Sequence, residues 1–177
     1  MNVCYRLNPQ NTIIDVNANW DRFALENAAG QLCRQRIIGL PLERFIQGDT
    51  TQMFVRTMLQ SVRLRQLPLT RQYRCDSPDR RRLMQMTLIP ATSGEVALEH
   101  RLLQETPFPL PFHFATVQSP TPLPKINRCS HCNRLNRPPD LDWLDPQQLL
   151  PAPDPTQPIT VHYTICPKCH RLNHACE

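Results

Sequence analysis

The sequence predicts an α+β fold followed by a small cysteine-rich module that a metal ion holds together. Five segments of residues 1–105 have the alternating pattern of strands, with helical spacing between the second and third. Only five of the nineteen prolines fall in residues 1–105, and two C-x-x-C pairs lie near the other end. We therefore predict a packed domain over residues 1–105, a proline-rich linker over 106–124 and a metal-binding module over 125–177.

Two strands begin the packed domain. Residues 3–7 and 12–16 surround Asn8-Pro9-Gln10-Asn11, which is rich in turn formers. We expect these two strands to form a hairpin.

Three helices are expected next. Trp20 and Phe23 begin a helical pattern that ends near Gly30, and a short helix runs through Phe45. A longer helix is capped by Asp49 or Thr50 and ends before Pro68. Its predicted apolar stripe consists of Met53, Phe54, Thr57, Met58, Ser61 and Val62.

Three more strands complete the domain. Residues 69–75 and 82–89 are joined by the turn Asp76-Ser77-Pro78-Asp79, and residues 95–103 alternate as a final strand. The predicted order is two strands, three helices and three strands.

This order, together with several local segments, resembles a PAS domain. The segments are Ile14-Asp15-Val16-Asn17, Trp20 with Phe23-Ala24, Ile37-Ile38-Gly39-Leu40-Pro41-Leu42, and the hairpin from Tyr73 to Met86. The whole chain is similar to small bacterial PAS-type proteins that end in paired cysteines. The resemblance implies a PAS-like five-stranded antiparallel sheet with helices on one face. It also implies a sensory, signal-transduction or scaffold role.

The resemblance also suggests cofactors that can be checked against the sequence. Flavin-photosensing PAS domains carry a cysteine where this chain has Glu43, which forms no photoadduct. Histidine-ligated haem needs a histidine within the domain, and His100 is the first, near the end of the last strand. Neither cofactor is supported, and the cofactor-binding residues of this domain stay unknown.

The two cysteine pairs share the pattern C-x-x-C-x-R-L-N. Cys129 and Cys132 form the first pair, and Cys166 and Cys169 the second, 33 residues later. A C-x-x-C turn directs both sulfur atoms at one ion, and two such turns complete a closed tetrahedral shell. We predict one structural Zn²⁺ per chain on these four residues. The repeated Arg-Leu-Asn further predicts two similar knuckles that face each other across a pseudo-two-fold axis.

Other uses of these cysteines stay open. The same four thiolates could hold an iron–sulfur cluster or act as redox-active thiols, and Cys166–His170 also matches the attachment pattern of c-type haem. Any of the nearby residues could replace one ligand: His131, His162, His170, His174 or Cys176.

Charge offers a rival function. Residues 1–105 carry fourteen arginines against ten carboxylates, and five of these arginines gather on one hairpin: Arg71, Arg74, Arg80, Arg81 and Arg82. They could bind nucleic acid, but Tyr73 is the only aromatic residue among them, so we favour a solvated face paired with Asp76 and Asp79.

The functional prediction is a non-enzymatic regulatory or protein-interaction protein. No phosphate-binding glycine loop or nucleophile–base arrangement can be assembled from the sequence. We expect a protein partner or a homodimer formed through the sheet. The absence of an export signal and of a long apolar run predicts a soluble, cytoplasmic protein without membrane contact. The signal, the partner and the pathway cannot be read from the sequence.

Overall fold

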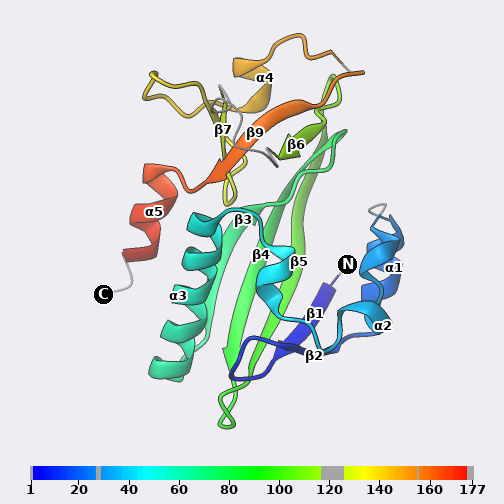
Figure 1. Ribbon diagram of the computed structural model, residues 1–177, viewed down its shortest axis with the longest axis vertical. Coiled ribbons are helices and arrows are strands. Elements are labelled where there is room, and N and C mark those ends of the chain that lie inside the picture. The colour runs from blue at the N-terminus through cyan, green and yellow to red at the C-terminus, as the bar shows by residue number, and fades with distance from the viewer. Residues whose placement is uncertain (1, 27–28, 117–125, 155, 175–177) are drawn as a thin grey trace. The chain divides into compact units, whose positions relative to one another are not determined.

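The structure, a computed structural model, describes residues 2–26, 29–116, 126–154 and 156–174 (Figure 1). The chain forms two compact units, each described separately below. The first contains Met1–Gln47, Gln52–Tyr73 and Leu83–Gln104. The second contains Gly48–Thr51, Arg74–Arg82 and Glu105–Glu177. Segments from the predicted packed domain therefore belong to both units, and residues 117–124 of the predicted linker lie outside the described residues.

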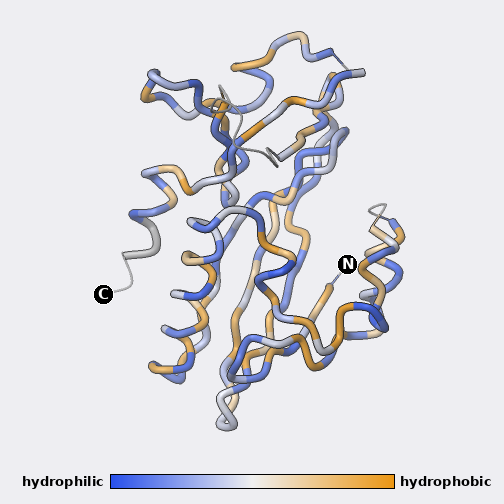
Figure 2. The backbone as a smooth tube through the Cα atoms, in the orientation of Figure 1, coloured by the Kyte–Doolittle hydropathy of each residue, from blue (hydrophilic) through white to orange (hydrophobic). Residues whose placement is uncertain are grey.

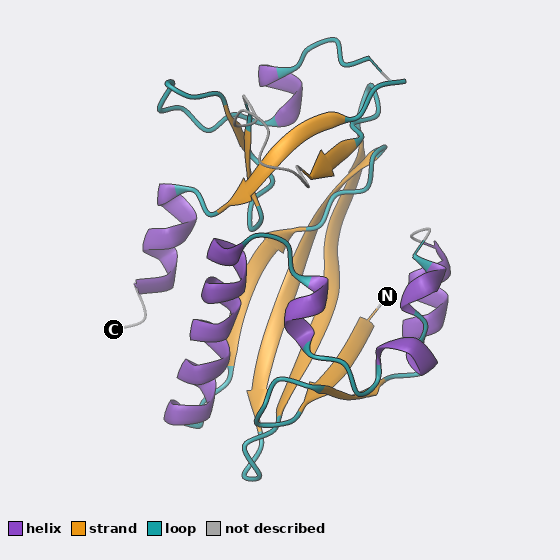
Figure 3. Cartoon of the chain, in the orientation of Figure 1, coloured by secondary structure: helices purple, strands orange, loops and turns teal. Residues whose placement is uncertain are grey.

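A five-stranded sheet is the framework of the first unit (Figure 3). Its strands are β1 (Asn2–Leu7), β2 (Ile13–Val16), β3 (Leu69–Arg74), β4 (Arg80–Pro90) and β5 (Val96–Pro107), in the spatial order β2-β1-β5-β4-β3. The first and last parts of this unit meet at the centre, where β1 pairs antiparallel with β5. The predicted strands are confirmed, and β5 runs four residues beyond its predicted end.

Helices connect β2 to β3. They are α1 (Trp20–Glu26), the 3-10 turn η1 (Gly30–Leu32), α2 (Arg34–Ile37), the 3-10 turn η2 (Leu42–Phe45) and α3 (Asp49–Arg65). The long helix begins at Asp49, one of its two predicted caps, and ends three residues before Pro68. Proline has no amide hydrogen and disfavours helical backbone at the residue before it, so the helix cannot continue through Pro68.

A single hydrophobic cluster joins the sheet to these helices. Leu7, Leu88 and Leu98 from the strands are at most 1% exposed, and α3 contributes Met58, Leu59 and Val62. Hydrophobic residues recur accordingly along the strands and α3 (Figure 2). The predicted stripe was wrong at Met53, which is 62% exposed. Val55 packs against the cluster instead, because positions 55, 58, 59 and 62 share one face of the helix.

A four-stranded sheet is the framework of the second unit. Its strands are β6 (Phe114–Thr116), β7 (Asn127–Cys129), β8 (Leu135–Asn136) and β9 (Ile159–Thr164), in the order β6-β9-β7-β8. Two short helices, α4 (Pro146–Leu149) and α5 (Pro167–His174), complete it. The helix predicted over residues 145–150 is confirmed, with Asp145 as its capping residue.

The core of this second unit is small. Ile126, Leu135 and Val161 are its buried residues, and Leu149 and Leu150 pack against them. Leu141, which we expected to cover the metal module, is 92% exposed. It lies in a proline-rich segment between β8 and α4, and no described helix or strand includes it.

Within the predicted linker, aromatic residues are buried. Phe108 and Phe112 are 9% and 3% exposed and pack edge to face with ring centroids 5.1 Å apart. Their backbone amides donate to carbonyl oxygens of the β3–β4 turn at Asp79 and Pro78. This stretch is therefore ordered against the hairpin turn, although proline is frequent in it.

In the described part of the chain, each helix is too short or too polar to cross a lipid bilayer.

Candidate metal centre

Parallel pairing of β7 with β9 brings the two cysteine pairs together. Cys129 is the last residue of β7, and its register partner on β9 is Thr164, two residues before Cys166. Parallel strands that are paired in this register end at the same edge of a sheet. The sheet therefore closes the 33-residue gap between the pairs, and no long loop has to be positioned by the metal alone.

The first pair lies in a tight turn between β7 and β8. The Asn133 amide donates to the Cys129 carbonyl, and the Cys129 amide donates to the Arg134 carbonyl, each at 2.9 Å. Asn133 has a φ of 57°, a left-handed conformation that asparagine tolerates better than most residues. Leu135 then enters the core, and the buried Asn136 side chain donates to the carbonyls of Asp140 and Asp142.

The second pair lies at the start of helix α5. Cys166 precedes the helix, and its sulfur accepts a hydrogen bond from the Cys169 amide at 3.4 Å. Pro167 occupies the first helical position, where its missing amide hydrogen costs nothing. The predicted pair of similar knuckles was therefore wrong, because the first pair forms a turn and the second begins a helix.

The four sulfur atoms form one compact cluster. All lie within 4.8 Å of one another, and the Sγ atoms of Cys132 and Cys166 are 3.8 Å apart. A tetrahedral zinc site with Zn–S bonds of about 2.3 Å has edges of about 3.8 Å. In addition, the Cys166 amide donates to the Cys129 sulfur at 3.4 Å. The cluster could therefore hold a metal ion, and its geometry fits zinc.

Burial and proton sharing agree with a metal-binding role. Cys129, Cys166 and Cys169 are at most 4% exposed, and Cys132 is partly exposed. Hydrogen bonding with Cys132 lowers the pKa of Cys129 to about 7, and hydrogen bonding with Cys129 lowers the pKa of Cys166. Hydrogen bonding with Cys129 raises the pKa of Cys132 and of Cys169. Without a metal, these thiols share too few protons; a divalent cation would bind all four as thiolates.

The alternative ligands that the sequence suggested lie outside this cluster as far as it is described. Among the described side chains, only the four cysteines form a group of three or more metal-ligating residues. The carbonyl of His131 accepts a hydrogen bond from the Arg74 amide at 2.7 Å. The side chain of His174 and all of Cys176 lie outside the described part of the chain.

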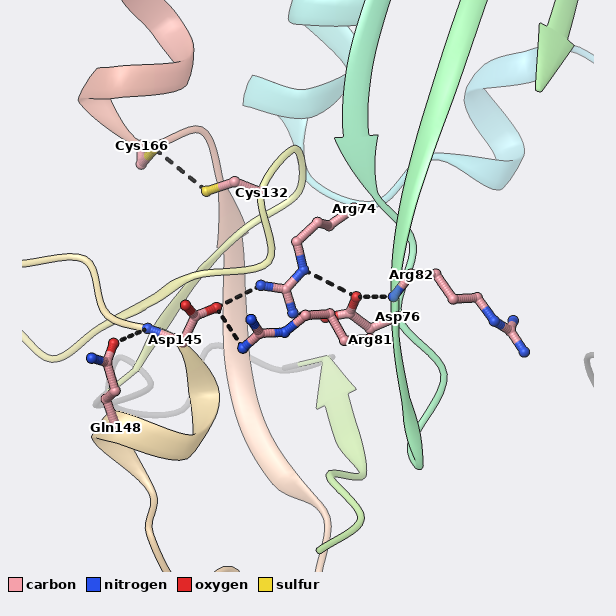
Figure 4. A network of polar contacts seen from close by, with 8 residues as sticks. All are labelled: Arg74, Asp76, Arg81, Arg82, Cys132, Asp145, Gln148 and Cys166. Atoms are coloured by element: carbon pink, nitrogen blue, oxygen red, sulfur yellow. Dashed lines mark hydrogen bonds and ion pairs between the residues drawn. The ribbon is translucent and has the colours of Figure 1, made fainter. Parts of the chain in front are cut away.

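Beside the cluster lies an ionic network that sequence reasoning missed (Figure 4). The Arg74 side chain, 12% exposed, pairs with Asp76 and with Asp145, whose side chains are 3% and 23% exposed. Burial alone would lower the pKa of Arg74, but hydrogen bonds and ion pairs with these carboxylates raise it. Arg81 pairs with Asp145 as well. The network ties the β3–β4 hairpin to the start of α4.

Asp145 also caps α4 while it accepts these arginines. Its side chain accepts from the backbone of Gln148, and the Gln148 side chain accepts from the Asp145 amide at 3.0 Å. The signal that could have found it is the sequence Asp145-Pro146-Gln147-Gln148, a capping box with proline at the first helical position. Its pairing with Arg74, 71 residues away, has no local signal.

The remaining hairpin arginines are paired with carboxylates too. Arg80 contacts Asp79 and Glu105, and Arg82 contacts Glu105 at 2.7 Å. We expected Asp76 and Asp79 as partners, and both are; Glu105 and Asp145 are additional ones. Arg80, 47% exposed, is the most open to solvent of these ion-paired arginines.

The start of α3 also belongs to the second unit and lies against β9 and the first cysteine turn. The Thr51 and Ser130 hydroxyls are 2.6 Å apart. Gly48 has a φ of +82°, and a Cβ atom there would lie 2.9 Å from the Tyr163 carbonyl oxygen. Only glycine fits this backbone conformation and this approach.

The first unit contains an apolar cavity of about 230 Å³. Tyr5, Trp20, Phe45, Met86 and Leu98 are among its lining residues. Its volume lies below the roughly 300–1,000 Å³ typical of pockets for drug-sized ligands. Of the methionines considered as core or pocket residues, Met58 and Met84 are buried and Met86 lines this cavity.

His100 lies on the helix-facing side of β5. Its Nδ1 is 2.8 Å from the Tyr73 hydroxyl, and its ring stacks on Tyr5. Among the described residues, its Nε2 is buried without a hydrogen-bond partner. Burial lowers the pKa of His100 from 6.5 to about 4, so the folded unit holds the imidazole neutral.

Comparisons with known proteins define no family. No family model matches the sequence, and no curated protein does. Among solved structures, the chain resembles a domain of an HTR-like protein from Haloarcula marismortui, with a TM-score of 0.42 and 16% sequence identity. The similarity covers 58% of this chain and 98% of that domain. At this TM-score the likeness does not establish a shared fold.

Proposed function

We propose that the protein is a non-enzymatic regulatory or interaction protein, with a PAS-type domain and a structural zinc site. The observation that carries the zinc assignment is the closed cluster of Cys129, Cys132, Cys166 and Cys169. Four thiolate ligands fill a tetrahedral shell and leave no position for a substrate or an activated water. Zinc in this setting would cross-link the ends of β7 and β9 and perform no chemistry.

A PAS-type regulatory role is supported by the architecture of the first unit. It has the five-stranded antiparallel sheet with a helical layer packed against it that the sequence resemblance implies. Side chains of β5 alternate, so that Leu98 faces the helices while Glu99, Arg101 and Leu103 face the other way. This second face includes Leu103, which is 37% exposed. We propose it as the surface for a protein partner or a second copy.

Protein recognition is favoured here over nucleic-acid binding. Arg74, Arg80, Arg81 and Arg82 all have carboxylate partners, so their charges are largely compensated. A phosphate backbone would have to compete with these ion pairs. Retention of DNA or RNA at low salt, lost on neutralising Arg80 and Arg82, would instead support the nucleic-acid alternative.

An iron–sulfur cluster is the other alternative that the four thiolates allow. Anaerobically purified protein separates the two, because a zinc site is colourless and an iron–sulfur cluster absorbs visible light. We expect no visible absorbance. A brown protein with iron and acid-labile sulfide would replace the zinc assignment.

A test of the interaction role compares the intact protein with a Cys129→Ser, Cys166→Ser variant in pull-down experiments. A Cys75→Ser variant is the matched control, because Cys75 lies outside the cluster. Partners that are lost only in the cluster variant would map to the second unit. Partners that all three proteins retain would map to the first.

Homodimerisation is tested separately by light scattering. Leu103→Glu places a charge on the proposed sheet surface, and Leu67→Glu, at a position 65% exposed and outside the sheet, is its control. We expect Leu103→Glu to lower the molar mass or abolish partner binding, and Leu67→Glu to do neither. Equal behaviour of the two variants would rule out this surface.

A further inference from the structure

We propose that Cys132 is a modification site at which a hydroperoxide attacks the metal centre, so that metal is released; this inference rests on the zinc site proposed above. The reacting group is the Cys132 sulfur, and the residue that completes the reaction is Cys166.

Access singles out Cys132 among the four ligands. Cys129, Cys166 and Cys169 are 0%, 2% and 4% exposed, so an oxidant in solution does not reach their sulfur atoms directly. Cys132 is partly exposed because it lies at the open end of the turn between β7 and β8. Oxidation of cysteine depends on thiolate character and on exposure, and metal binding gives all four residues the first property.

Hydrogen bonding separates the ligands in the same way. The Cys129 sulfur accepts the Cys166 amide, and the Cys166 sulfur accepts the Cys169 amide, both at 3.4 Å. Amide hydrogen bonds withdraw charge from a thiolate and make it harder to oxidise. Within the described residues, the contacts of the Cys132 sulfur are with the other cysteines of the cluster. Cys132 is thus both the exposed ligand and one without this protection.

The first step is a two-electron oxidation. The Cys132 thiolate attacks the terminal oxygen of the hydroperoxide, an S–O bond forms and the O–O bond breaks. The leaving alkoxide takes a proton and departs as an alcohol, or as water when the oxidant is hydrogen peroxide. Cys132 becomes a sulfenic acid, the peroxide is reduced, and Cys132 is lost as a thiolate ligand.

The second step forms a disulfide. The Cys166 sulfur lies 3.8 Å from that of Cys132, and a disulfide needs an S–S distance of about 2.05 Å. The Cys166 thiolate attacks the sulfenic sulfur, the S–S bond forms, the S–O bond breaks, and hydroxide leaves as water after protonation. Only Cys129 and Cys169 then remain as ligands, and two thiolates do not complete the four-coordinate shell of a structural zinc site.

The test follows the four cysteines of zinc-loaded, full-length protein during exposure to hydrogen peroxide. Samples are alkylated at successive times, digested and analysed by mass spectrometry, while a chromogenic chelator reports free zinc. We expect Cys132 to lose its thiol about tenfold faster than Cys169, as expected from its exposure. A Cys132–Cys166 disulfide should predominate, with one zinc released for each disulfide formed.

Two matched variants separate access from general sensitivity. Cys132→His and Cys169→His each keep four zinc ligands, because three cysteines and one histidine form a common structural set. Zinc release from Cys132→His should be at least about tenfold slower than from the unsubstituted protein, and Cys169→His should release zinc at close to its rate. If Cys132→His does not retain zinc, the modification map of the unsubstituted protein decides alone.

The proposal is overturned if Cys132 is oxidised no sooner than the other three ligands, or if another disulfide predominates. Equal rates of release from both histidine variants would overturn it as well. Failure of the zinc site itself gives a different result, because metal analysis before the peroxide is added would then find no zinc.

Discussion

The first unit is stabilised by a hydrophobic core, whereas the second combines a small core with a thiolate cluster and an ionic network. Eleven buried residues form the core cluster of the first unit, against three in that of the second. Each fully buried aliphatic side chain contributes roughly 1.5–3 kcal/mol. The second unit thus lacks much of the apolar stabilisation of the first, and metal binding can supply it. This difference predicts that the two units respond to opposite perturbations.

Metal removal should have the largest effect. A strong chelator should abolish amide-exchange protection of β9 and α5, while β1, β4 and β5 stay protected, because structural zinc contributes on the order of 10 kcal/mol to small domains. Hydrogen exchange followed by mass spectrometry measures both regions in one sample. Equal loss of protection in both units would show that they do not differ in this way.

Truncation of the first core should give the converse result. Leu88 is 0% exposed, and Leu88→Ala should lower the free energy of unfolding of this unit by about 4 kcal/mol through lost burial and a residual cavity. Leu103→Ala, on the partly exposed face, is the matched control and should cost far less. Denaturant unfolding measures the loss, and metal analysis should find zinc unchanged in both variants.

Breaking the ionic network should weaken the second unit without touching the cysteines. Asp76→Asn leaves the buried Arg74 guanidinium with less compensation, and removal of one partner of a buried pair costs about 3 kcal/mol. Asp79→Asn, whose side chain is 69% exposed, should change little. Chelator-induced unfolding should need less chelator in the first variant, and identical titrations would remove the network from the account.

Acid should weaken the first unit through His100. The unfolded chain protonates this imidazole near pH 6.5, but the folded unit does so only near pH 4. Stability is therefore fully present above pH 6.5 and falls as the pH decreases toward 4, by about 3 kcal/mol at most. In a His100→Gln variant this part of the pH dependence should disappear. Unfolding curves of the two proteins between pH 7 and pH 4 that stay parallel would contradict the assignment.

Local signals predicted most of the first unit. Strand alternation, turn residues and the position of Pro68 gave its five strands and the extent of α3. The error at Met53 arose because two helical faces contain apolar residues, and only the sheet decides which face is buried. Packing against a partner element is not visible in the periodicity of one helix.

In the second unit, the candidate ligands could be predicted but their setting could not. The spacing of Cys129, Cys132, Cys166 and Cys169 identified the cluster. The repeated Arg-Leu-Asn suggested equal knuckles, although Pro167 favours a helix start and Asn133 a left-handed turn. The parallel pairing of β7 with β9 and the contact of Arg74 with Asp145 join distant segments, which no local pattern specifies.

Metal analysis combined with X-ray absorption spectroscopy of the purified, full-length protein tests the central claim most directly. We predict one zinc per chain, bound by four sulfur atoms at about 2.3 Å. Substitution of the four cysteines should remove the metal and the exchange protection of the second unit together. A metal-free protein whose second unit is equally protected would contradict the account, as would a zinc ion bound by nitrogen or oxygen atoms.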